Sequence, residues 1–266
     1  MKPIFLNRRV KFVLLCVLAV LFLLPVFWMF FASATPRGVP LLSKSTFSLE
    51  VIKRNFFNIW QILPLGRFTF NSLLVVGLAV PITLVVSSLA GFSISQLPKP
   101  IQKRWVILSL AVLMVPGVAL WMSRFWLYKA LGWYNTIWAL IAPAWMGTSP
   151  FYVLMFYRAF RRIPEEIYVS ARLDGAGAVC LWWKIALPMV KPTTIAVAFL
   201  SFLVYWGDYV SPLLYLQTED RYTLVVALQL LRQMGTSDWS LLMTASVYVT
   251  MFPLLFFLFI QKDFGR

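Results

Sequence analysis

Long apolar runs alternate with short polar segments along most of the chain. A helix that crosses a membrane needs about 20 mostly apolar residues, and six runs reach that length. The pattern therefore predicts six transmembrane helices, at residues 12–31, 68–92, 105–123, about 134–156, about 193–216 and 241–260. The predicted fold class is an all-α integral membrane protein with a single transmembrane domain over residues 1–266.

Each predicted span contains at least one proline: Pro25, Pro81, Pro116, Pro143 with Pro150, Pro212 and Pro253. Proline removes a backbone donor and bends a helix, but inside a membrane the neighbouring helices can satisfy the freed carbonyls. We therefore interpret most of these prolines as sources of ordinary helix curvature.

The composition supports a membrane protein. Of the 266 residues, 61% are hydrophobic and 12% are charged, whereas a soluble domain has about 45–50% and about 25%. A water-soluble enzyme with an ordinary surface is therefore excluded. The basic N-terminus and first run resemble a secretory signal, but this run is longer than the roughly 7–15 residues of a signal core, so we expect a retained first helix.

The net charge is +15, from 24 Lys and Arg against 9 Asp and Glu. The basic residues lie in the gaps between apolar runs, which indicates membrane topology and not nucleic-acid binding. Both termini and the loops on their side carry 15 Lys and Arg, whereas the loops on the other side carry 9. Since cytoplasmic loops are the richer in Lys and Arg, both termini are predicted to be cytoplasmic.

The residue types exclude several kinds of chemistry. The chain has no His, which excludes His metal ligands, a His general base and a Ser-His-Asp triad. Cys16 lies in an apolar run and Cys180 in a distant basic segment, and we predict neither a disulfide nor a metal site from them. The sequence also lacks the Gly-x-x-x-x-Gly-Lys-Ser/Thr phosphate loop, so the chain is not expected to bind ATP itself.

The segment 158–191 is longer than the other loops on the predicted cytoplasmic side and has the pattern of two short helices. Pro164 suits a first helical position, and the two acids that follow it are favoured in a first turn by the helix dipole. Asp174-Gly175 is a turn signal, because Gly can take a left-handed conformation at the end of a helix.

The second helix of this segment is predicted over about 178–186 and carries Trp182 and Trp183, with Leu187-Pro188 ending it. Two interpretations are open at this point. Either the hairpin docks on a protein partner, or it lies on anionic lipid with its tryptophans at the interface.

The same segment resembles the cytoplasmic loop of the permease subunits of binding-protein-dependent ABC importers. That loop has the form Glu-Ala-Ala, three residues, Gly, nine residues, Ile, one residue, Leu-Pro. Ser170 replaces the first Ala by another small residue, whereas Val169 stands in place of the Glu. Five positions match in register: Ala171, Gly175, Ile185, Leu187 and Pro188.

Other stretches are similar to the carbohydrate-uptake branch of that family, the maltose, lactose and glycerol-phosphate importers. They are distributed along most of the chain: Phe70-Asn71-Ser72, Tyr157-Arg158-Ala159-Phe160, Ile163-Pro164-Glu165-Glu166, Asp174-Gly175-Ala176, Trp206-Gly207-Asp208-Tyr209, Pro212-Leu213-Leu214 and Tyr222-Thr223-Leu224. The chain resembles the six-span permease of such a pair. The resemblance implies a permease subunit that forms half of an ATP-driven translocation pathway for a sugar or sugar derivative.

The resemblance also implies partners and a location. The partners are a second, homologous permease, two ATPase subunits, an extracytoplasmic substrate-binding protein and the lipid bilayer of a prokaryotic plasma (inner) membrane, with no nucleic acid. ATP and Mg would belong to the ATPase subunits. This chain would be a non-catalytic subunit with no cofactor of its own, and its hairpin would transmit closure of the ATPases to the pore.

Coupling residues follow from the matched motif. Ala171 would be small to allow close approach, Gly175 would make the turn, Ile185 and Leu187 would be apolar docking or packing contacts, and Pro188 would stop the helix. The full set implied for ATPase coupling is Ala171, Asp174, Gly175, Ile185, Leu187 and Pro188.

One acid, Asp208, falls within a predicted span. It follows Pro192 by 16 residues, which is about 24 Å along a helix and places it in the outer half of the bilayer. Its oxygens are candidates to bind ligand hydroxyls, Trp206 and Tyr209 are candidates to stack on a sugar ring, and Asn71 is a further candidate in the substrate pathway. The alternative is a structural acid near the outer interface.

The segment between the last two predicted spans, 217–239, is the region that the family uses to contact its binding protein, although a solvated loop is an alternative. Its charged residues are Glu219, Asp220, Arg221, Arg232 and Asp238. Two alternative functions also stay open. One is the same architecture for another solute, such as a polyamine or phosphate ester, and the other is a self-sufficient secondary carrier, which would need intramembrane charges for ion coupling.

Overall fold

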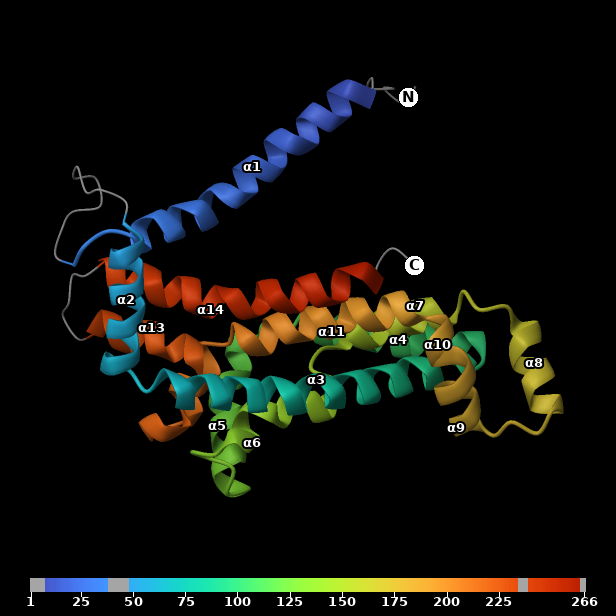
Figure 1. Ribbon diagram of the computed structural model, residues 1–266. Helices are drawn as coiled ribbons and strands as arrows, with labels where there is room; N and C mark the ends of the chain where they lie inside the picture. The colour runs from blue at the N-terminus through green and yellow to red at the C-terminus, as the bar shows by residue number, and fades with distance from the viewer. Residues whose placement is uncertain (1–7, 38–47, 234–238, 264–266) are drawn as a thin grey trace. The chain divides into compact units, whose positions relative to one another are not determined.

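The computed structural model describes residues 8–37, 48–233 and 239–263, and its regular secondary structure in these ranges is entirely helical, as predicted (Figure 1). The α-helices are α1 (Arg8–Ser33), α2 (Leu49–Ile62), α3 (Leu65–Gln96), α4 (Lys99–Leu113), α5 (Trp121–Ala130), α6 (Ile137–Ile141), α7 (Pro150–Phe160), α8 (Glu165–Leu173), α9 (Ala178–Cys180), α10 (Leu187–Met189), α11 (Lys191–Trp206), α12 (Val210–Tyr215), α13 (Leu224–Gln233) and α14 (Trp239–Ile260). Shorter 3₁₀-helices cover Gly117–Leu120, Ala142–Met146, Glu219–Arg221 and Gln261–Asp263, and a π-helix covers Leu181–Ala186.

Four helical segments are long and apolar enough to cross a membrane: Phe12–Ser33, Leu65–Gln96, Ile137–Phe160 and Trp239–Ile260. Two bent pairs, Lys99–Leu113 with Gly117–Ala130 and Ala178–Met189 with Lys191–Trp206, add one span each if each pair is taken as a single span. The described residues therefore supply four to six candidate spans, in the regions where the apolar runs predicted them.

The predicted third span, 105–123, is not a single helix. After α4 ends at Leu113, Pro116 intervenes and the segment Gly117–Ala130 continues at 85° to α4. Proline cannot donate a backbone hydrogen bond, and it disfavours a helical conformation of the residue before it. The interpretation as ordinary curvature is therefore wrong at Pro116.

The fourth span is also interrupted. Between α6 and α7 the chain forms the 3₁₀-helix Ala142–Met146, and then Gly147 (φ 69°) and Thr148 (φ 61°) both take left-handed backbone conformations. Non-helical backbone at membrane depth is tolerated where protein surrounds it. This break lies within the region that packs around α3 and α11.

The described chain divides into two compact units, one of Met1–Leu65 with Ala227–Met251 and one of Gly66–Val226 with Phe252–Arg266. In the first unit, α2 forms within residues that hydropathy left in a loop. Asn55 of α2 is buried and donates to the carbonyls of Ser33 (2.9 Å) and Thr35 (3.0 Å). Carbonyls at the end of a helix lack intrahelical donors, so Asn55 satisfies the end of α1.

In the second unit, α7 packs against α4 and α11 and approaches α3 closely at Gly91. A Cβ atom on Gly91 would lie 2.7 Å from Phe156 Cβ and 2.8 Å from Tyr157 N, closer than real side chains come. Small residues at such contacts let the backbones of membrane helices approach. All of the predicted coupling and pathway residues lie in this second unit.

Candidate functional site

The segment 158–191 contains two helical arms joined by a turn, and we call it the hairpin. The first arm, α8, begins at Glu165, and Pro164 caps it with an extended backbone (φ −54°, ψ 139°). Pro164, the predicted first helical residue, thus lies one position before the helix begins. Glu165 and Glu166 occupy the first turn as predicted, where the helix dipole favours acids.

The turn after α8 has the geometry of a Schellman cap. Gly175 has φ 85°, its N–H donates to the Arg172 carbonyl (3.0 Å), and the Ala176 N–H donates to the Ala171 carbonyl (2.9 Å). These two bonds satisfy carbonyls at the helix end and need a left-handed residue at Gly175. The predicted left-handed conformation of Gly175 is confirmed, and Ala171 and Gly175 belong to a single capping motif.

The second arm, Ala178–Met189, differs from its prediction, because Pro188 does not end it. The π-helix Leu181–Ala186 closes with the Leu187 N–H donating to the Trp182 carbonyl, and a new helical turn follows in which Pro188 is near the start. Because proline has no N–H, Pro188 donates no backbone bond to the turn before it, at the point where the π-helix ends. The chain turns only afterwards, and α11 runs at 86° to the arm.

The inner face of the hairpin packs against a buried cluster that includes Phe92 and Phe160. Ala171, Ile185 and Leu187 are partly buried against it. The structure therefore places these three predicted coupling residues in packing positions. Asp174, Gly175 and Pro188 are exposed.

The outer face of α8 carries an exposed stripe at helical spacing, made of Glu166, Val169, Ser170 and Leu173. The exposed fractions of Val169 and Leu173 are 47% and 83%. Residues three and four apart lie on one side of a helix. Glu166 and Val169 therefore share the face that points away from the buried cluster.

Two side chains of α8 contact α3. The buried ring of Tyr168 lies 6.1 Å from that of Phe92, centroid to centroid, and its hydroxyl donates to the Phe160 carbonyl (3.3 Å). Burial raises the pKa of Tyr168 to about 12, against an opposing effect of the Arg172 charge, so the phenol is a neutral donor. One turn further along α8, Arg172 Nη2 donates to Gln96 Oε1 (2.6 Å).

Asp208 does not lie inside a helix. The helix α11 ends at Trp206, and Asp208 is half-buried in the break before α12, where its Oδ1 accepts from the Ser211 N–H (3.0 Å). Short acidic side chains favour such helix starts over helix interiors, which suits Asp208 to this break. One carboxylate oxygen of Asp208 therefore stabilises local backbone at this break.

The two aromatic residues beside Asp208 differ in exposure. Trp206 is buried, and its ring stacks on Phe202 (5.6 Å between centroids, 8° between planes) and contacts Phe252 (4.8 Å). Tyr209 is half-buried. In this conformation the Trp206 ring is therefore used in aromatic packing within the protein.

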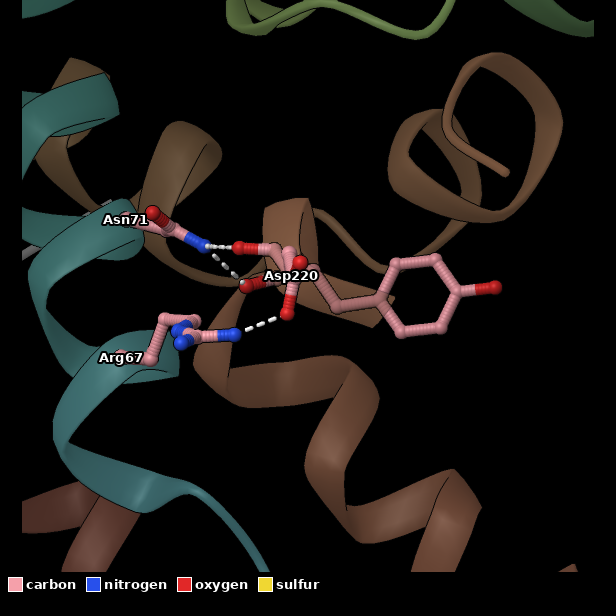
Figure 2. Close-up of polar contacts among 4 residues, drawn as sticks. Arg67, Asn71 and Asp220 are labelled. Atoms are coloured by element: carbon pink, nitrogen blue, oxygen red, sulfur yellow. Dashed lines mark hydrogen bonds and ion pairs between the residues drawn. The ribbon is translucent and has the colours of Figure 1, made fainter. Parts of the chain in front are cut away.

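Asn71 connects α3 to the 3₁₀-helix Glu219–Arg221. Its amide donates to the backbone carbonyls of Asp220 (2.8 Å) and Tyr222 (3.0 Å), and Arg67, one turn earlier, forms an ion pair with Asp220 (Figure 2). Both amide hydrogens of Asn71 are thus used to hold this segment.

The neighbouring residue extends this contact, because Ser72 Oγ accepts from the Leu224 N–H (2.7 Å) at the start of α13. Two of the short stretches singled out in the sequence, Phe70-Asn71-Ser72 and Tyr222-Thr223-Leu224, therefore meet in the structure. Among the charged residues predicted for the same region, Asp238 lies outside the described residues.

A family of binding-protein-dependent transport system inner membrane components matches residues 83–264. The chain belongs to this family. The chain is 26% identical to the lactose transport system permease protein of Rhizobium radiobacter, over 96% of this chain and 92% of that protein. It is 24% identical to the melibiose/raffinose/stachyose import permease protein of Bacillus subtilis, over 97% and 94%.

A solved relative of this inner membrane component shows the same fold. It comes from the crystal structure of a bacterial ABC transporter involved in the import of the acidic polysaccharide alginate. The two chains superpose with a TM-score of 0.73 at 17% identity, covering 98% of this chain and 99% of that one.

Sequence reasoning missed Asn135, a second residue that holds the segment after α12 in this inner membrane component. Its backbone is left-handed (φ 54°), its N–H donates to the Tyr215 carbonyl (2.8 Å), and its Oδ1 accepts from the N–H groups of Gln217 (2.9 Å) and Thr218 (3.3 Å). Asn is among the residues that tolerate this backbone conformation. An Asn between two apolar runs signals a turn, but nothing in the local sequence indicates partners 80 residues away.

Proposed function

We propose that this chain is the permease subunit of an ATP-driven importer for a sugar or sugar derivative, and that it forms half of the translocation pathway. The family match supports the permease role, and relatives named for lactose and for melibiose, raffinose and stachyose favour a sugar. The observation that carries the coupling role is the Schellman-capped hairpin, because Ala171 and Gly175 of the loop motif together form its cap.

The proposed topology has six spans, with both termini and the hairpin on the cytoplasmic side of a prokaryotic plasma membrane and residues 1–266 acting as one permease domain. The bent pair of α4 with Gly117–Ala130 serves as the third span and α11 as the fifth. The excess of Lys and Arg on the hairpin side supports this orientation. Three of the residues counted on the two sides lie outside the described residues: Lys2 and Arg266 on the hairpin side and Lys44 on the other side.

The proposed complex contains a second permease, two ATPase subunits that bind ATP and Mg, and an extracytoplasmic binding protein. This chain contributes no catalytic group or cofactor of its own. Its long apolar helices lie in the bilayer. Its basic residues set the orientation of the chain in the membrane and do not bind nucleic acid.

The proposed ATPase contact is the exposed stripe of α8, where an apolar ridge of Val169 and Leu173 is flanked by Glu166 and Ser170. Gly175 and Asp174 shape the turn that presents this stripe. Ala171, Ile185 and Leu187 act from the inner face, by holding both arms against the buried cluster. Pro188 sets the course of the second arm toward α11.

On the substrate pathway, we propose that Asp208 and Tyr209 at the break after α11 are the contact points, because both are half-exposed. One Asp208 oxygen caps α12, and the other is available to a sugar hydroxyl. Trp206 and Asn71 then act indirectly, since the first packs between aromatic rings and the second holds the 220–222 backbone.

Reconstitution tests the proposal. The chain is assembled with its partner permease, ATPase and binding protein in proteoliposomes, and ATP hydrolysis and uptake are measured with candidate sugars. Binding-protein-stimulated hydrolysis with accumulation of a sugar supports the proposal. Uptake by the chain alone, driven by an ion gradient without ATP, contradicts it and indicates a secondary carrier.

A further inference from the structure

The hairpin touches α3 at two successive turns. On α8, Tyr168 and Arg172 are four residues apart, and on α3 their respective partners Phe92 and Gln96 are also four residues apart. Residues at this spacing lie on one face of a helix. One face of α8 is therefore matched to one face of the end of α3, through an aromatic contact and a charged hydrogen bond.

The end of α3 near Gln96 is held by hydrogen bonds from a neighbouring helix. Gln102 of α4 is buried, and its amide donates to the carbonyls of Ser95 (3.1 Å) and Leu97 (2.6 Å). Tyr157 of α7 in turn donates to Gln102 Oε1 (3.0 Å). Gly91 also brings α7 against α3, so α4 and α7 both hold this end of α3.

The other end of α3 holds a different segment. Arg67 forms an ion pair with Asp220, and Asn71 donates to backbone carbonyls of the same segment (Figure 2). Ser72 accepts from the Leu224 N–H. Asn71 and Gln96 are 25 residues apart in the same continuous helix, which is about 37 Å at about 1.5 Å per residue. One helix therefore carries the hairpin at one end and the 220–224 segment at the other.

We propose that α3 is a mechanical connection that transmits movement between the two faces of the membrane. Gln96 receives the movement of the hairpin through Arg172, and Asn71 and Ser72 transmit it to residues 220–224. This inference rests on the proposed function, in which the hairpin contacts the ATPase, and on the expectation that the segment 217–239 contacts the binding protein. It acts in addition to the chain connection from the second arm of the hairpin through α10 into α11. Gln96 and Asn71 are positioning residues in this scheme, since neither contacts the substrate.

A double-mutant cycle across the length of α3 tests the connection. Gln96→Ala removes the acceptor of Arg172, and Asn71→Ala releases the carbonyls of Asp220 and Tyr222. In the reconstituted complex, each variant is expected to assemble normally and to lower binding-protein-stimulated ATP hydrolysis by about fivefold or more. If the two sites act through one connection, the double variant loses no more stimulation than the more severe single variant.

The controls separate this inference from a general loss of structure. Gln96→Glu keeps an acceptor for Arg172 and is expected to retain stimulation, while Lys103→Ala, an exposed change on α4, is expected to have no effect. Ser72→Ala replaces Asn71→Ala in the cycle if the latter lowers assembly. The proposed connection is wrong if the losses of stimulated ATP hydrolysis in the two single variants multiply in the double variant. It is also wrong if stimulation is unchanged in Gln96→Ala. Absence of stimulation in the wild-type complex instead overturns the proposed function.

Discussion

The hydroxyl oxygen of Thr148 lies 2.7 Å from that of Tyr205, and on its other side 2.5 Å from that of Thr83. Thr148 has a left-handed backbone (φ 61°), which β-branched residues rarely adopt. Thr83 belongs to α3 and Tyr205 to α11, so three hydroxyls join three helical segments where the fourth span is broken. Backbone strain of this kind persists only where the surroundings hold it, and these hydrogen bonds are what holds it here.

Removing the tyrosine hydroxyl tests this role. Tyr205→Phe is expected to lower the free energy of unfolding by about 0.5–1.5 kcal/mol, because a buried hydrogen bond is lost while the ring stays in place. Thermal unfolding of the purified complex in detergent measures the change. Tyr209→Phe is the matched control, since the Tyr209 hydroxyl has no hydrogen bond to the described residues. Equal stability of the two variants would show that the hydroxyls do not hold the break.

The contact of α3 with α7 predicts a sharp difference between two glycines of one helix. Gly91→Ala places a Cβ 2.7 Å from Phe156 Cβ, and overpacking of this kind costs about 1–3 kcal/mol. Gly77→Ala meets nothing within 4 Å and is expected to be neutral or slightly stabilising, because Ala favours helix. Yield and unfolding temperature of both variants check the prediction. If the unfolding temperature falls as much in Gly77→Ala as in Gly91→Ala, the close approach of α3 and α7 at Gly91 does not explain the loss.

The Schellman cap predicts a second pair of glycine variants. Gly175→Ala forces an alanine into φ 85°, at a cost of roughly 1–2 kcal/mol, although its Cβ meets no neighbour. Gly175→Pro is expected to be more severe, because proline cannot adopt this φ or donate to the Arg172 carbonyl. Both should leave the chain inserted but reduce coupled transport. Gly177→Ala, with φ −72°, is the control, and normal sugar-stimulated transport in Gly175→Pro would remove the coupling role of the turn.

These sites show which features a sequence can predict. The left-handed turn at Gly175 and the acids of the first turn of α8 follow from local rules, since caps and dipoles act over a few residues. Pro188 was misassigned because its effect depends on the π-helix before it, which changes the hydrogen-bond register. The bond from the Ser211 N–H to Asp208 could not be predicted either, because the apolar run continues past Trp206 and does not show where the next helix begins.

Partners that are distant in the sequence cannot be predicted from local sequence patterns. The sequence identifies Phe70-Asn71-Ser72 as a motif but does not indicate that Asn71 and Ser72 hold residues 220–224. The same is true of Gln96 and Arg172, which are 76 positions apart. The apolar run 68–92 places Asn71 and Ser72 in their helix but ends before Gln96. Packing between distant segments selects the partners of all these residues.

The exposed stripe predicts a change in assembly without a change in folding. Val169→Glu restores the acid of the family loop motif, and since Val169 is 47% exposed, the stability of the chain alone should be unchanged. If the ATPase surface that meets Val169 is apolar, burying an unpaired carboxylate should weaken the association by several kcal/mol. If it keeps a partner for the acid, association is equal or stronger. Val169→Thr is the uncharged control, and wild-type association and coupling in all assays would show that this face of α8 does not meet the ATPase.

The cap made by Asp208 allows its structural role to be separated from a role in transport. Asp208→Asn keeps the oxygen that accepts from the Ser211 N–H and should assemble normally, since Asn and Asp cap helices equally well. Asp208→Ala loses the cap, at a cost of about 0.5–2 kcal/mol. A charged acceptor makes hydrogen bonds roughly twice as strong as a neutral one, so Asp208→Asn should still slow uptake of a neutral, hydroxyl-rich solute. Initial uptake per assembled complex, at fixed binding-protein concentration, measures this. A lower yield with an unchanged rate per complex, in either variant, assigns Asp208 to structure alone and takes it off the pathway.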